Sequence, residues 1–248
     1  MKKLYEKSEI GFAVAWIVAY VVLTSVADNL SKGIGVAKCV TLPVHLLLCA
    51  ALLGFVFKNR LGEKYGFRRP FYPASRFLYY LPLAVVALSK LAGGVGLPMT
   101  PVETALFVLS MSCVGLLEEV IFRGLLFKAM ERENARRAIV VSAVTFGLGH
   151  IVNAFNGSGR SLPETLVQIL FAVAVGFALV LVFHRGGSLV PCILFHAVNN
   201  ALGAFAAEGG FAPWVEMLVN GGIILLIAAY CLWLVKRLPE PKPAGSRG

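Results

Sequence analysis

Two carboxylates and one guanidinium occur inside a single apolar stretch of this 248-residue sequence. The stretch reads G-L-L-E-E-V-I-F-R-G, with its charges at Glu118, Glu119 and Arg123, and apolar residues continue past it. Residues four apart share a helix face, so Glu119 and Arg123 are expected to pair. Glu118 lies about 100° around the helix from Glu119, which leaves its carboxylate available for chemistry. Because the apolar run extends beyond the cluster, we favour a buried site over a charged helix end that snorkels to an interface.

Two other apolar stretches carry imidazole and amide groups that could complete such a site. One ends F-G-L-G-H at His150, and the other contains H-A-V-N-N from His196 to Asn200. His196 and Asn200 are four apart and share one helix face. A single histidine in a helix is often a hydrogen-bonded core residue. Two of them, together with an amide and the carboxylates, favour a functional site.

The composition indicates whether these apolar segments lie in water or in lipid. Apolar residues make up 58% of the chain, charged residues 15%, and the mean hydropathy is +0.79. A soluble domain carries about 25% charged residues, so this chain requires lipid around it. The five cysteines form no C-x-x-C pair and are interpreted as small apolar side chains. The net charge of +10 indicates cytoplasmic loops and anionic lipid as partners, not nucleic acid.

Eight apolar segments, separated by Gly and Pro clusters, predict an all-α polytopic transmembrane helix bundle of about eight spans. We expect one transmembrane domain over residues 1–238, a motif-bearing core at about 100–205, and a disordered cytoplasmic tail at 239–248. The segments are Ile10–Ala27, Val36–Phe57, Phe77–Ala92, Thr104–Met130, Ala138–Asn153, Pro163–Phe183, Leu189–Phe205 and Val215–Val235.

Lys and Arg residues predict the orientation of the bundle. With the N-terminus in the cytoplasm, 18 of them fall in inside segments and four in outside segments. The positive-inside rule therefore favours eight spans with both termini cytoplasmic. We expect an integral protein of a bacterial or archaeal plasma membrane.

The depths of the polar residues agree with one another. At the rise of an α-helix, Glu118 lies about 15 Å from the cytoplasmic flank of its segment and His150 about 20 Å. His196 and Asn200 lie about 11 Å and 17 Å from theirs. Residues at similar depth on three helices indicate one site in the bundle interior. We place it in the cytoplasmic to middle part of the membrane.

The ordered motifs E-E-x-x-x-R, F-x-x-x-H and H-x-x-x-N on separate apolar helices resemble a known family. It is the type II CAAX prenyl endopeptidase and bacteriocin-processing family of intramembrane proteases, also called CPBP or Abi. The resemblance covers about residues 100–205. It implies a catalytic glutamate at Glu118, a water-holding histidine at His150, and an oxyanion-stabilising pair at His196 and Asn200. Glu119 and Arg123 match the second Glu and the Arg of the first motif, and are expected to give structural support.

These residues can hydrolyse a peptide bond in more than one way. Glu118 can act as general base toward water, and His196 and Asn200 can donate to the oxyanion. Alternatively, Glu118, His150 and His196 could hold a divalent metal such as Zn²⁺ as a His₂Glu set, as in metalloproteases. The expected substrate is a peptide or protein, lipidated or not, cleaved near the cytoplasmic side. A catalytically silent scaffold or immunity protein and a transporter with a Glu/His relay are the alternative functions.

Overall fold

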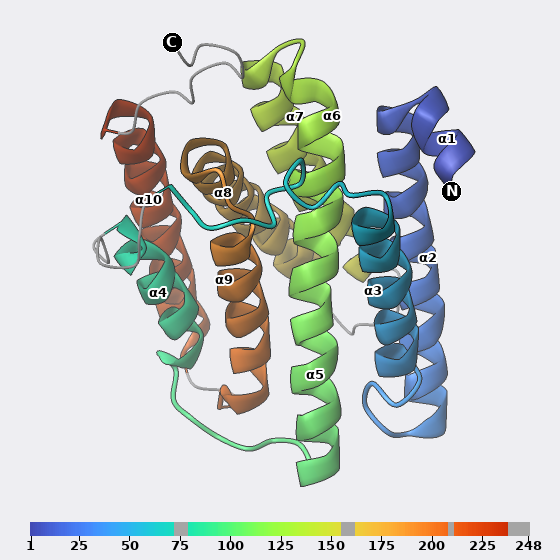
Figure 1. The fold of residues 1–248 in the computed structure, drawn as a ribbon. Helices are drawn as coiled ribbons and strands as arrows, with labels where there is room; N and C mark the ends of the chain where they lie inside the picture. Colours follow the sequence, from blue (N-terminus) through green and yellow to red (C-terminus); the bar gives the residue numbers. More distant parts are fainter. Residues whose placement is uncertain (72–78, 155–161, 208–210, 238–248) are drawn as a thin grey trace.

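The computed structural model describes residues 1–71, 79–154, 162–207 and 211–237, and within these ranges it is a bundle of helices without β-strands (Figure 1). The predicted tail at 239–248 lies outside the described residues. In the first half of the chain the helices are α1 (Lys2–Lys7), α2 (Glu9–Ile34), α3 (Thr41–Lys58), α4 (Leu81–Leu88), η2 (Ser89–Leu91) and α5 (Pro101–Glu118). Then follow η3 (Glu119–Phe127), α6 (Lys128–Glu131), α7 (Ala135–Leu148), η4 (Gly149–Ala154), α8 (Leu162–Gly186), α9 (Val190–Ala201), η5 (Leu202–Phe205) and α10 (Pro213–Arg237).

The helix ends follow local sequence signals. The Ser8 hydroxyl caps α2 by accepting from the Gly11 amide at 3.0 Å, and the helix stops at Gly35, whose φ of 81° favours glycine. At the start of α5, Thr100 and Glu103 form a reciprocal capping box. These signals set where α2 and α5 begin and therefore which turns of each helix reach the middle of the bundle.

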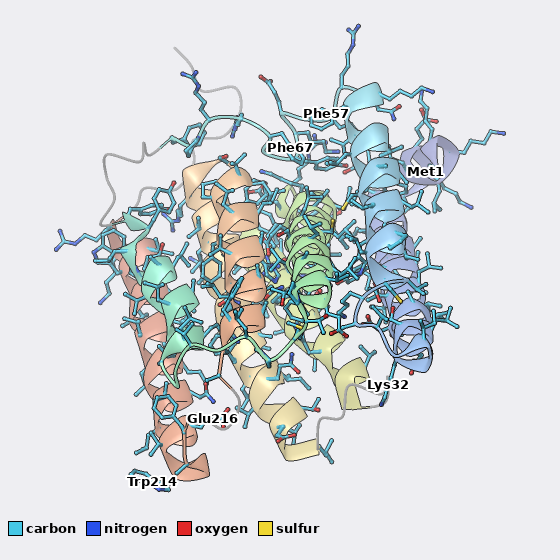
Figure 2. The ribbon with its side chains drawn as sticks, turned by 90° about the horizontal axis from the view of Figure 1, so that it is seen from below. Met1, Lys32, Phe57, Phe67, Trp214 and Glu216 are labelled. Atoms are coloured by element: carbon cyan, nitrogen blue, oxygen red, sulfur yellow. The ribbon has the colours of Figure 1, made fainter. Side chains whose placement is uncertain are left out.

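The helices run between two ends of the bundle. α1 and the C-terminal ends of α3 and α10 lie at one end, which we call the terminal end (Figure 1). The turn between α2 and α3 lies at the other, which we call the distal end. In Figure 2, Met1, Phe57 and Phe67 accordingly lie toward one end, and Lys32, Trp214 and Glu216 toward the other. Among the described loops and helix ends, Lys32, Lys38 and Lys90 are the basic residues of the distal end, and the other interhelical Lys and Arg residues gather at the terminal end.

All eight predicted apolar segments contain helix, and six are long and apolar enough to cross a membrane among the described residues. The other two form the shorter apolar helices Leu81–Leu91 and Val190–Phe205. At about 1.5 Å per residue, 11 residues span about 17 Å, well short of a hydrocarbon core of about 30 Å. The all-α polytopic bundle is confirmed. The count of eight crossings stays a prediction.

Candidate active site

The two neighbouring carboxylates face different surroundings. Glu118 is the last residue of α5, and its side chain is 12% exposed. Glu119 begins a nine-residue π-helical segment, η3, and is 0% exposed. π-Helical turns leave carbonyls without their usual partners and are common at functional sites. Here the Ser142 hydroxyl of α7 donates to the Phe122 carbonyl at 2.9 Å. The wider turn is therefore stabilised by a neighbouring helix.

Glu119 pairs with Arg123, as their spacing predicted. Arg123 Nη1 lies 3.0 Å from Glu119 Oε1, and both side chains are fully buried. The guanidinium also donates to the Gly176 carbonyl at 3.4 Å and lies 4.2 Å from the centre of the Phe146 ring. A buried arginine needs several such contacts to offset its lost hydration. Arg123 thus ties η3 to both α7 and α8.

His196 bridges the two carboxylates. Its Nδ1 lies 2.8 Å from Glu119 Oε1, and its Nε2 lies 3.4 Å from Glu118 Oε2. Because Arg123 holds Glu119 as an acceptor, Nδ1 donates its hydrogen to Glu119, and Nε2 has a lone pair whenever the ring is neutral. The sequence suggested His196 as an oxyanion donor. The geometry places its free nitrogen beside Glu118, where it can donate only after it has gained a proton.

Tyr20 contacts Glu118 from a helix on which the sequence analysis identified no motif. Its hydroxyl donates to Glu118 Oε1 at 2.7 Å, and the residue is 7% exposed. In α2 it occurs in the middle of an apolar span, away from the interfaces where membrane tyrosines gather. This position in the sequence could have identified Tyr20 as a candidate, because a buried tyrosine hydroxyl usually has a hydrogen-bond partner.

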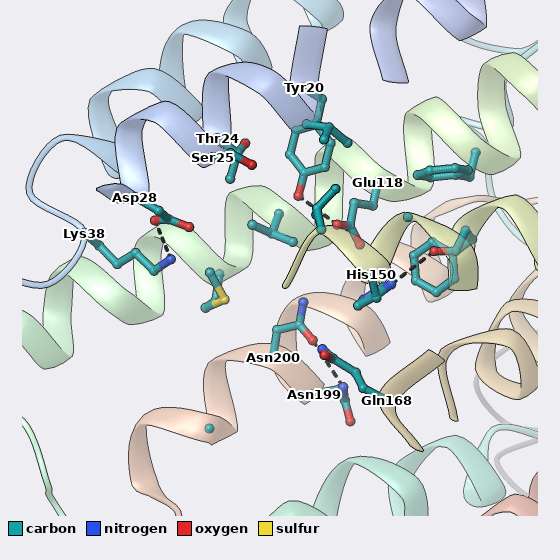
Figure 3. A pocket seen from close by; sticks show the side chains of 18 of the residues that line it. Tyr20, Thr24, Ser25, Asp28, Lys38, Glu118, His150, Gln168, Asn199 and Asn200 are labelled. Carbon is teal, nitrogen blue, oxygen red and sulfur yellow. Dashed lines mark hydrogen bonds and ion pairs between the residues drawn. The ribbon is translucent and has the colours of Figure 1, made fainter. Parts of the chain in front are cut away.

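His150 and Asn200 lie on the same pocket as Glu118 (Figure 3). His150 Nδ1 lies 3.1 Å from the Phe146 carbonyl, so Nδ1 is the donor and Nε2 an acceptor. Asn200 Oδ1 accepts from Asn199 Nδ2 at 3.2 Å. The structure therefore brings a carboxylate, an imidazole and an amide from three helices to one space, as their matching depths predicted.

The pocket has a volume of about 340 Å³. Its described lining comes from α2, α5, α7, α8, α9 and neighbouring segments, and it includes both polar and apolar side chains. The lining residues are Tyr20, Val21, Thr24, Ser25, Asp28, Lys38, Lys90, Phe107, Met111, Val114, Glu118, Phe122, Phe146, Gly149, His150, Val152, Gln168, Asn199, Asn200 and Gly203. This lining extends from Glu118 toward the distal end, whereas the sequence analysis favoured the side that carries the termini.

Two residues without ionisable groups set the spacing of the helices. A Cβ on Gly115 of α5 would lie 2.5 Å from the Ala197 nitrogen of α9, so only glycine allows this approach. Phe146 packs edge-on against both histidine rings, with centroids 5.3 Å from His150 and 5.6 Å from His196. Gly115 and Phe146 both occur within the quoted motifs, but their role in helix spacing was not predicted from the sequence.

The alternative metal site is not formed. Among the described residues, no group of three or more His, Cys, Asp or Glu side chains could hold a metal ion. Glu118, His150 and His196 are all described, and His196 does not line the pocket on which Glu118 and His150 lie. The three candidate ligands therefore do not form a His₂Glu centre in this arrangement.

A helical bundle with a carboxylate, an imidazole and an amide on one internal pocket, and a second imidazole in contact with the carboxylate, has the composition of an intramembrane hydrolase. Residues 98–202 match the family model of Rce1-like type II CAAX prenyl endopeptidases. The chain thus carries an Rce1-like domain, which confirms the resemblance and indicates a CAAX-protease-like intramembrane endopeptidase. No curated protein and no solved structure matches the chain. Tyr20 lies outside the matched residues.

Proposed function

We propose that this protein hydrolyses a peptide bond inside the membrane with a water molecule activated by Glu118. The observation that carries the proposal is the convergence of Glu118, His150 and Asn200 on one pocket, with His196 between the two carboxylates. Glu118 Oε2 has no hydrogen-bond partner within the described part of the chain. It is therefore available as the base.

The first step is attack of water on the peptide carbonyl. Glu118 takes a proton from the water, and His150 Nε2 accepts a hydrogen bond from the same water and holds it in place. The oxygen of the water bonds to the carbonyl carbon, and the carbonyl π electrons move to its oxygen. The Asn200 amide donates to the resulting oxyanion. Such preorganised donors typically contribute about 3 kcal/mol.

The second step is departure of the amine. The proton on Glu118 can pass to His196 Nε2, 3.4 Å from Oε2, and Glu119 stabilises the imidazolium through Nδ1. This use of a carboxylate behind an imidazole follows the logic of catalytic triads. The imidazolium then donates its proton to the leaving nitrogen while the C–N bond breaks. Glu119 and Arg123 act by holding His196, and Tyr20 by holding Glu118.

Reconstitution of the purified protein in liposomes with a peptide library tests this function. Wild type should release defined fragments, and Glu118→Gln should release none while retaining the wild-type thermal unfolding profile. The glutamine keeps the shape of the side chain and removes the base. Near-wild-type cleavage by Glu118→Gln would show that Glu118 is not the base. The absence of cleavage by wild type would favour the scaffold or transporter alternatives.

A further inference from the structure

α2 forms one wall of the pocket, although it lies outside the residues that match the family model. Tyr20, Thr24 and Asp28 of this wall are four residues apart, so they form a row along one face of the helix (Figure 3). At one end of the row, Tyr20 donates to Glu118. At the other end, Asp28 pairs with Lys38 at 2.7 Å. The hydroxyl of Thr24, in the middle of the row, has different surroundings.

Thr24 is held from behind this wall by two buried polar side chains. Its Oγ1 lies 3.1 Å from Nε2 of His45 in α3, and Nδ1 of His45 lies 3.0 Å from Oγ of Ser110 in α5. His45 and Ser110 are both 0% exposed, and neither is among the described residues that line the pocket. Polar groups buried in the apolar interior of a membrane protein are costly and by default indicate a functional site. Thr24 is the member of this chain of hydrogen bonds that reaches the pocket.

The contact with His45 leaves the Thr24 hydroxyl with hydrogen-bonding capacity for a ligand. A hydroxyl has one hydrogen to donate and two lone pairs that accept. If the neutral imidazole donates to Oγ1, Thr24 keeps its hydrogen for the pocket. If the imidazole accepts instead, Thr24 keeps its lone pairs. Both tautomers fix the hydroxyl, and the backbone of a peptide carries a matching C=O and N–H at nearly every residue.

The place of Thr24 in the row indicates which part of a bound peptide it meets. Thr24 lies one helical turn from Tyr20, which is about 6 Å along α2. An extended chain rises about 3.3 Å per residue, so this distance corresponds to about two residues of peptide. Because Tyr20 holds Glu118, the peptide group beside Thr24 is about two residues from the bond that Glu118 faces.

We propose that Thr24, oriented by His45, binds a backbone peptide group of the substrate about two residues from the scissile bond. This inference rests on the proposed function. Thr24 is then a substrate-binding residue, and His45 is a positioning residue that acts through it. A contact with the backbone requires an extended segment at that point of the substrate but places no demand on its side chain.

The first test measures binding without turnover. The probe is a fluorescent library peptide selected by its affinity for purified Glu118→Gln, and its Kd is measured by anisotropy in that background. Thr24→Val removes the hydroxyl, keeps the shape and should raise Kd about tenfold, whereas Thr24→Ser should stay within about twofold. Thr145→Val is the matched control and should leave Kd unchanged. The Thr145 hydroxyl donates to the Val141 carbonyl of its own helix, and Thr145 is not among the described residues that line the pocket.

Peptide analogues separate a contact with the backbone from a change in the fold. Each residue of the probe is in turn N-methylated or joined through a reduced amide, which removes one N–H or one C=O. One analogue, changed about two residues from the cleavage site, should bind about tenfold more weakly when Thr24 is present. The same analogue should bind Thr24→Val with no further loss, because the contact is already missing. Losses that add at every position overturn the contact.

The role of His45 is tested through Thr24. His45→Phe keeps a ring and removes both hydrogen bonds, so it should raise Kd about as much as Thr24→Val. The double variant should bind no more weakly than either single variant. Full additivity would show that His45 does not act through Thr24. If His45→Phe fails to fold, the analogues with Thr24→Val still test the contact itself.

Cleavage of the same peptide by wild type in liposomes distinguishes this inference from the proposed function. A wild-type Kd for Thr24→Val overturns the inference even if wild type cuts the peptide. Weaker binding by Thr24→Val without any cleavage by wild type instead leaves Thr24 as a peptide-binding residue and rejects the peptidase function.

Discussion

Tyr20 and Glu118 are 98 residues apart in the sequence, yet their side chains share a hydrogen bond of 2.7 Å. The bond holds one oxygen of the proposed base and leaves the other for the reaction. Removal of the hydroxyl should therefore leave Glu118 free to rotate away from the water. Hydrogen bonds to charged groups typically contribute about 1.5–3 kcal/mol, and each 1.4 kcal/mol is about tenfold in rate.

We expect Tyr20→Phe to lower kcat about tenfold or more, with KM for the same peptide changed by less than about twofold. The matched control is Tyr230→Phe, which removes a buried hydroxyl that donates to the Tyr79 carbonyl at 2.8 Å, away from the pocket. Steady-state kinetics in liposomes measures both. Equal losses of kcat in the two variants would mean that Tyr20 only stabilises the fold.

Arg123 is expected to matter for folding more than for chemistry. Arg123→Ala leaves Glu119 buried without its ionic partner, and breaking a buried pair from one side typically costs about 3–5 kcal/mol. The variant should have a lower yield and a lower Tm in detergent. Arg136→Ala removes an exposed arginine from α7 and should change neither. A wild-type Tm for Arg123→Ala would contradict the supporting role of the Glu119 pair.

At the scale of elements, the contact of α5 with α9 decides where His196 lies. Gly115→Ala places a methyl group 2.5 Å from the Ala197 nitrogen and 2.7 Å from its Cα. These are backbone atoms, so α9 itself must move, and overpacking of this kind typically costs about 1–3 kcal/mol. We expect a lower Tm and a loss of activity. Gly54→Ala is the control because a Cβ there meets nothing within 4 Å. Cleavage assays and thermal unfolding measure both variants.

The elements also show how far the sequence could predict the site. The pairing of Glu119 with Arg123 follows from helix periodicity. The shared depth of Glu118, His150 and Asn200 follows from the rise per residue of a helix. Both can be predicted from the sequence, because they depend only on positions along one helix. The contact of His196 with Glu119 depends on how α9 approaches η3, and periodicity does not determine the distance between helices. The π-helical geometry of η3 depends likewise on the Ser142 hydroxyl of a neighbouring helix.

At the scale of the whole molecule, hydropathy was sufficient to predict the class of fold, but it did not predict the end of the bundle toward which the pocket extends. Depth estimates measure how far a residue lies along its own helix from a charged flank. They do not show which half of the bundle is filled. Large side chains such as Phe127 and Leu179 fill the half toward the terminal end, while smaller and polar ones such as Ser25 line the half toward the distal end.

Orientation in the membrane gives the last prediction. The 18-to-4 distribution of Lys and Arg predicts that the terminal end is cytoplasmic. A reporter fused to the C-terminus should therefore report the cytoplasm, because α10 ends with Lys236 and Arg237 at the terminal end. A reporter inserted after Gly35, in the turn between α2 and α3, should report the outside. Protease protection in intact cells and in inverted vesicles measures both. If the C-terminal reporter is external, the whole bundle is inverted. The distal end, toward which the pocket beside Glu118 extends, would then face the cytoplasm with the geometry of the pocket unchanged.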